Sequence, residues 1–169
     1  MSKNISKDIQ ENLNYILDLL KDCDDLIIRE LEIGEVLRVK MAIVYIDGLI
    51  NKEFISEYAI GSLIKEEELK SFTLQGYRTT ILEVIKEEVL ATSEIEEESQ
   101  WDNIIKLILS GDTLLLIDNA EKAIIIGSRS SPTRGVDEPK TESVIRGPRE
   151  GFTEVLKYNT TLIRRKIRD

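Results

Sequence analysis

The sequence contains no histidine, and this absence excludes more candidate functions than any other feature of its composition. It removes Ser-His-Asp and Cys-His arrangements, the commonest general base at neutral pH, and most zinc sites. The one cysteine, Cys23, stands between Asp22 and Asp24, whose negative charges disfavour the thiolate form that a nucleophile needs. A single cysteine also allows no internal disulfide, which fits a reducing compartment.

Motifs that bind phosphate or dinucleotides are absent as well. There is no Gly-x-x-x-x-Gly-Lys-Ser/Thr loop, and no Gly-x-Gly-x-x-Gly follows an expected strand. Carboxylates are plentiful, but neighbours such as Glu87 and Glu88 are consecutive and do not share a helix face. We therefore expect a protein that is not an enzyme, with no catalytic residues, no cofactor and no metal site.

Long hydrophobic runs and signal-peptide features are also missing. Apolar runs such as Leu114–Ile117 and Ala123–Ile126 are the length of strands, far short of the roughly 18 residues of a membrane span. Hydrophobic residues still make up 41% of the 169 residues, and aromatic residues only 5%. This composition predicts one ordinary domain with an aliphatic core and no membrane span within the sequence given.

Charge is distributed unevenly along the chain. Residues 1–128 carry 13 basic and 26 acidic side chains, whereas residues 129–169 carry 10 basic and 6 acidic ones. The first part should repel nucleic acid and anionic lipid, so we expect no nucleic-acid partner. The basic C-terminal part either attracts a polyanion or pairs its charges internally, and interleaved acidic residues such as Asp137 and Glu142 favour internal pairing.

Helices and strands are expected to alternate up to about residue 128. Helical spacing predicts helices over about Ser6–Lys21, with Ser6 as N-cap, over 51–64, and over Trp101–Ser110, ended by Gly111. Residues 80–89 are ambiguous: their spacing is helical, but a strand over 89–95 stays open as an alternative. Alternating or continuous apolar residues predict strands at Leu26–Ile33 and Val36–Ile46, the latter covered on both faces. Thr113–Ile117 and Lys122–Ile126, separated by Asp118–Glu121, predict an antiparallel hairpin. The acidic run Glu94–Glu98 is expected to be a solvated loop.

The chain then changes character. Its three prolines, Pro132, Pro139 and Pro148, all lie after residue 127, which predicts an extended linker. A last amphipathic helix is expected from about Pro148 to Ile167. The expected fold class is α/β, with α+β possible: a small mixed sheet flanked by helices over 1–128, a linker over 129–148, and the first helix of a second subdomain over 149–169.

One stretch carries a specific resemblance. Residues 146–154 read Arg-Gly-Pro-Arg-Glu-Gly-Phe-Thr-Glu, preceded by an arginine, a Glu-Pro and a glutamate, and followed by an asparagine and a Leu-Ile-Arg-Arg run. This order resembles the signature of the A subunits of GerA-type spore germinant receptors. Ser110-Gly111-Asp112-Thr113 and Val44–Leu49 also look like that family.

The resemblance implies a subunit of a receptor in the spore inner membrane, with this region on the cytoplasmic or spore-core side. Its partners would be the B and C subunits, and the complex would respond to a small nutrient such as an amino acid, sugar or nucleoside. In the family, a soluble region of two small α/β subdomains precedes several membrane spans. Two roles stay open for this region: sensing or relaying nutrient binding, or holding the receptor together without binding ligand. We expect the last helix to dock onto another copy of this segment, which gives a homo-oligomer, rather than to pack back on the first domain.

The motif residues are the candidate site. Arginines beside glycine and proline either bind an anion or hold the linker against the domain through ion pairs with carboxylates. We favour the second interpretation, a rigid corner held by internal ion pairs. The candidates for ligand or interdomain binding are Arg134, Glu138, Glu142, Arg146, Arg149, Glu150, Glu154 and Asn159. The candidates for a structural role are Gly147, Pro148, Gly151 and Phe152. We expect at least one linker charge pair, formed by Arg146 and Glu142 or by Arg149 and Glu154. The basic run Arg164–Lys166 would face solvent or a partner subunit rather than lipid headgroups.

Overall fold

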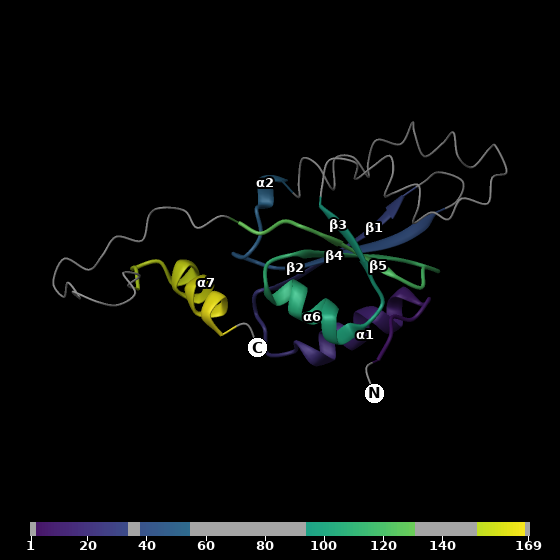
Figure 1. Cartoon of the computed structure of the whole chain (residues 1–169), viewed down its shortest axis with the longest axis horizontal. Helices are drawn as coiled ribbons and strands as arrows, with labels where there is room; N and C mark the ends of the chain where they lie inside the picture. The colour runs from purple at the N-terminus through teal and green to yellow at the C-terminus, as the bar shows by residue number, and fades with distance from the viewer. Residues whose placement is uncertain (1–2, 34–37, 55–93, 131–151, 168–169) are drawn as a thin grey trace.

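The computed structural model describes residues 3–33, 38–54, 94–130 and 152–167, and it has the α/β class expected from the sequence. A five-stranded sheet in the order β1-β2-β4-β5-β3 forms its centre (Figure 1). The strands are β1 Leu26–Ile33, β2 Val39–Ile46, β3 Ile95–Glu98, β4 Thr113–Ile117 and β5 Ala123–Ile126. The helices are α1 Ile9–Leu19, α2 Lys52–Phe54, α6 Trp101–Leu109 and α7 Leu156–Lys166.

The described sheet is antiparallel at each of its four strand pairings, so the expectation of a mixed sheet is corrected. The reason is the length of two connections. β1 and β2 are joined by residues 34–38 and β4 and β5 by residues 118–122, whereas a parallel pair needs a crossover of a dozen residues or more. The predicted hairpin is confirmed: Thr113 faces Ile126 and Leu115 faces Ile124, as a four-residue turn over Asp118–Glu121 requires.

Strand β2 lies inside the sheet and is buried from Met41 to Ile46, which confirms that it is covered on both faces. On one face, Leu13 and Ile16 of α1 and Ile104 and Ile108 of α6 pack against Val44 and its neighbours. Figure 1 shows these two helices along the same side of the sheet. A second aliphatic cluster on the other face includes Ile43, Leu115 and Ile124. The aliphatic core expected from composition is thus two layers separated by one sheet.

Two expectations about residues near helix starts are corrected. Asp8, not Ser6, caps α1, because the Asp8 side chain accepts a hydrogen bond of 2.8 Å from the Gln10 amide. The acidic run before α6 is strand β3 rather than a loop, and its last residue, Glu98, accepts from the Ser99 and Gln100 amides and from Asn103 Nδ2. The hydrogen bond from Gln100 is the main reason that the pKa of Glu98 lies below its ordinary value, and it outweighs the opposing effect of burial.

Several expectations fall outside the described residues. Of the helix expected over 51–64 only α2, Lys52–Phe54, is described, and the ambiguous segment 80–89 lies outside the described residues. Of the linker expected over 129–148, only Arg129 and Ser130 are described. Both the linker and the domain boundaries therefore stay predictions.

Gly111 ends α6 as predicted, with φ of +100°. A Cβ at this position would also lie 2.9 Å from the Leu49 carbonyl oxygen, which is part of the backbone and cannot rotate away. We expect Gly111→Ala to lower the free energy of unfolding by about 1–3 kcal/mol, measured by urea denaturation. Ser110→Ala, which removes only a hydrogen bond from Ser110 Oγ to the Lys106 carbonyl, is the control. Equal losses in the two variants would contradict this interpretation of Gly111.

Candidate functional site

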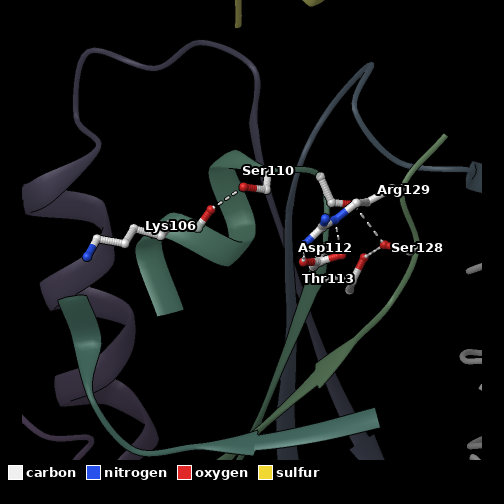
Figure 2. A network of polar contacts seen from close by, with 7 residues as sticks. Lys106, Ser110, Asp112, Thr113, Ser128 and Arg129 are labelled. Atoms are coloured by element: carbon white, nitrogen blue, oxygen red, sulfur yellow. Dashed lines mark hydrogen bonds and ion pairs between the residues drawn. The ribbon is translucent and has the colours of Figure 1, made fainter. Parts of the chain in front are cut away.

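The chain leaves the sheet after β5 through a polar cluster that we call the exit clamp: Asp112, Thr113, Ser128 and Arg129 (Figure 2). Arg129 donates from Nε to Asp112 Oδ1 at 2.9 Å and from Nη2 to Asp112 Oδ2 at 2.6 Å. Asp112 is only 4% exposed. Beside this pair, the buried hydroxyls of Thr113 and Ser128 lie 2.7 Å apart, and Ser128 Oγ donates to the Gly111 carbonyl at 3.2 Å. The hydrogen bonds to Asp112 raise the pKa of Arg129 further, so the guanidinium stays charged.

Main-chain pairing holds the same segment. The Asn51 amide donates to the Ser128 carbonyl at 2.8 Å, and the Ser130 amide donates to the Leu49 carbonyl at 2.9 Å. Ile50 and Arg129 form the antiparallel bridge between these two bonds. The path of residues 128–130 is therefore fixed by a short ladder on one side and by the exit clamp on the other.

Helix α7 packs back on its own domain, which corrects the expectation that it docks onto another copy. It lies next to this exit on a surface that we call the α7 seat: Asp25, Asp47, Gly48 and Ser130. Arg164 donates from Nε and Nη2 to the two carboxylate oxygens of Asp25. Lys157 Nζ lies 2.8 Å from Asp47 Oδ2, and Arg165 Nη2 donates to the Ser130 hydroxyl at 3.0 Å and to its carbonyl at 3.2 Å.

Gly48 allows this close approach. It adopts φ of +90°, and a Cβ there would lie 2.5 Å from Thr161 Oγ1 of α7. Lys157, Thr161 and Arg164 are three or four residues apart, so they share the helix face that meets the seat. The turn after β2, the turn before β1 and the exit from β5 therefore all contact one polar face of α7.

Asp47 pairs with two lysines, Lys157 and Lys52, since Lys52 Nζ also lies 2.6 Å from Asp47 Oδ1. Burial alone would raise the pKa of Asp47, but the hydrogen bonds from Lys157 and Lys52 outweigh burial and hold that pKa below its ordinary value. The same contact with Asp47 raises the pKa of Lys52. Asp47 thus stays ionised at neutral pH and attracts the lysine of α7 that faces it.

The apolar residues of α7 do not share in this contact to the same extent. No residue of α7 is buried, and Leu156 is 75% and Ile167 59% exposed. Phe152, just before the helix, is 73% exposed. Polar contacts therefore dominate the docking of α7, and its apolar residues stay largely open to solvent.

The start of α7 corrects the expected helix boundary. The helix begins at Leu156 rather than near Pro148, because the Asn159 side chain folds back on Thr153. Asn159 Oδ1 accepts from the Thr153 amide at 2.7 Å, and Asn159 Nδ2 donates to the Thr153 carbonyl at 2.6 Å. These bonds hold Thr153 outside the helix.

The structure describes only three of the candidate motif residues. Asn159 closes the start of α7 as above, while Glu154 and Phe152 are exposed. The other candidates, which are Arg134, Glu138, Glu142, Arg146, Gly147, Pro148, Arg149, Glu150 and Gly151, lie outside the described residues. Their roles and the linker charge pairs stay predictions.

Sequence reasoning missed the two carboxylates of the seat. Asp25 and Arg164 are 139 positions apart, and Asp47 and Lys157 are 110 apart, so neither pair has a local pattern. The basic run Arg164–Lys166, expected to face solvent or another subunit, instead directs Arg164 and Arg165 to the chain's own domain. The only sequence signal was the Asp47-Gly48 pair, which marks a turn after a strand.

Among residues 3–33, 38–54, 94–130 and 152–167, no helix is long and apolar enough to cross a membrane. The same ranges contain no group of three or more side chains suited to hold a metal ion.

Comparison with known structures identifies the fold first. The fold matches the N-terminal domain of the A subunit of the Bacillus megaterium spore germinant receptor GerK3, with a TM-score of 0.74 and 24% identity, over 99% of this chain and 58% of that one. At this identity the match supports the fold, a mixed α/β domain with an antiparallel sheet.

The family follows from sequence. The pattern of the family described as Bacillus/Clostridium GerA spore germination protein matches residues 14–169, and the chain belongs to this family. It is 32% identical to spore germination protein KA of Bacillus subtilis (strain 168) over 98% of its length, and 34% identical to spore germination protein GerLA of Bacillus cereus over 94%. It spans only 29% and 31% of those two relatives. The resemblance noted in the sequence is therefore confirmed at the level of the family.

Proposed function

We propose that this chain is the N-terminal module of the A subunit of a spore germinant receptor, and that it relays nutrient binding through the junction between its first domain and α7. The full-length subunit would act in the spore inner membrane with B and C subunits, with this module on the cytoplasmic or spore-core side. The role is non-catalytic. Family membership and the likeness to the GerK3 domain support the placement in a receptor.

The relay role is supported by a difference in burial between the contacts of the exit clamp and those of the α7 seat. The exit clamp fixes the chain at Arg129 through a buried carboxylate and a main-chain ladder. The α7 seat holds the next described element through polar contacts to a helix with no buried residue. A firm anchor beside a reversible contact allows α7 to change position while the domain keeps its fold.

An assembly role is the second candidate, because exposed apolar side chains on α7 suit a surface that another subunit covers. The two roles differ in what a weakened seat should do. A relay defect leaves the receptor present but unresponsive, whereas an assembly defect removes the receptor from the membrane.

The test uses the full-length subunit in spores that lack other receptors for the same nutrient. We expect Asp25→Asn combined with Asp47→Asn to change the germination rate at least about fivefold, while the abundance of the receptor in the inner membrane, measured by immunoblot, stays the same. Asp22→Asn is the matched control, since Asp22 is an exposed aspartate of the turn that leads to Asp25. Reduced abundance would favour assembly. Unchanged germination and abundance would contradict the relay.

A further inference from the structure

A groove of about 390 Å³ lies between α7 and the domain. No function has been assigned to it so far in terms of the exit clamp or the α7 seat. Its apolar wall is built by Leu109 at the end of α6, by Ile163 of α7 and by Ile167 directly after α7. Ile163 is 42% and Ile167 59% exposed, so both aliphatic side chains are accessible to a ligand in the groove. The volume lies within the range of small-molecule sites, which are mostly apolar with a few polar groups that fix orientation.

The polar rim of the groove carries an excess negative charge. Asp24, Asp25 and Arg164 line it, and Asp25 and Arg164 neutralise each other through their paired hydrogen bonds. Asp24 is exposed and has no hydrogen bond or ion pair with any residue in the described part of the chain. One uncompensated carboxylate therefore stands at the edge of an aliphatic wall.

We propose that this groove binds a small aliphatic primary amine. A primary ammonium group stays protonated at neutral pH, and it would pair with Asp24 while its branched chain lies against Leu109, Ile163 and Ile167. A ligand with a carboxylate would place a second negative charge beside Asp24. The site therefore selects a cation without a carboxylate. Because its walls come from both α6 and α7, a bound amine would also favour the docked position of α7.

The experiment is a titration of the 169-residue chain, labelled at the methyl groups of leucine and isoleucine, followed by NMR. The probe is isoamylamine, and the controls of the same skeleton are isovalerate and isoamyl alcohol. We expect saturable shifts at the methyl groups of Leu109, Ile163 and Ile167 with the amine, weaker shifts with the alcohol and none with the carboxylate.

Variants then test the charge. Asp24→Asn should weaken binding of isoamylamine about fivefold, as expected for one solvent-exposed ion pair. Asp22→Asn, an exposed aspartate two positions earlier, should leave the affinity unchanged. Unaltered core methyl shifts confirm that each variant is folded. The proposal is overturned by absence of saturation, by shifts elsewhere than the groove, by equal affinity for amine and alcohol, or by equal effects of the two variants. The site stands on its geometry and does not require the relay role, so binding without a germination defect would remove only the proposed function.

Discussion

Arg129→Gln is expected to lower the free energy of unfolding by about 1–3 kcal/mol, because it leaves the buried Asp112 carboxylate without its cation. This is less than the roughly 3–5 kcal/mol lost when a fully buried ion pair is broken, since the Arg129 side chain is 56% exposed and water screens its charge. Urea denaturation at neutral pH measures the effect. Arg129→Lys should recover only part of the loss, because a lysine cannot donate the paired hydrogen bonds that Arg129 Nε and Nη2 make to the two oxygens.

The reciprocal variant distinguishes a buried charge from a simple ion pair. Asp112→Asn leaves the cation on an exposed arginine, which water can solvate, so it should cost less than Arg129→Gln. Lys122→Gln is the matched control, since Lys122 is exposed to the same extent as Arg129 but pairs, at 2.9 Å, with Glu97, whose side chain is 22% exposed against 6% for Asp112. Its urea midpoint should not change. If Lys122→Gln and Arg129→Gln were equally destabilising, the burial of Asp112 would not be the cause.

Local patterns predicted the elements whose apolar residues repeat along the chain. The hairpin of β4 and β5 and the helix α6 were predicted within a residue because apolar runs, turn residues and Gly111 lie next to each other in sequence. Strand β3 was missed because Glu96 is exposed there and β3 lies at the edge of the described sheet, where glutamates are tolerated. The start of α7 was misplaced because the bonds between Asn159 and Thr153 override the helical spacing that begins at Phe152.

The candidate site was harder to predict than the fold. The family motif directed attention to residues 134–159, but the described contacts lie at Asp25, Asp47 and Asp112. Each of these carboxylates meets a partner that only the tertiary fold brings near. The distribution of charge along the sequence indicated a basic C-terminal part and an acidic remainder. In the α7 seat, basic side chains of the C-terminal part pair with aspartates of the acidic part.

High salt should release α7 from its seat, because charged pairs dominate the contact. The Debye length falls from about 30 Å at 0.01 M to about 3 Å at 1 M ionic strength. Each partly exposed pair contributes about 0.2–1 kcal/mol, and the paired bonds of Arg164 to Asp25 contribute more. Losing them should shift the ratio of docked to released α7 about 5-fold to 30-fold. The backbone amide shift of Gly48, which Thr161 approaches, reports the docked fraction in NMR spectra.

Variants and pH separate this release from general unfolding. Asp25→Asn should give at low salt the Gly48 shift that the unaltered chain shows at high salt, while the amides of β4 keep their positions. The pKa of Asp47 is lowered in the docked state, so its contribution is fully present above the ordinary aspartate pKa of about 4 and is lost as the pH falls through the lowered value. Acidification below about pH 4 should therefore also release α7. If the Gly48 amide shift changed with neither salt, nor pH, nor the Asp25→Asn substitution, then apolar contacts and not charged pairs would hold α7 on the domain.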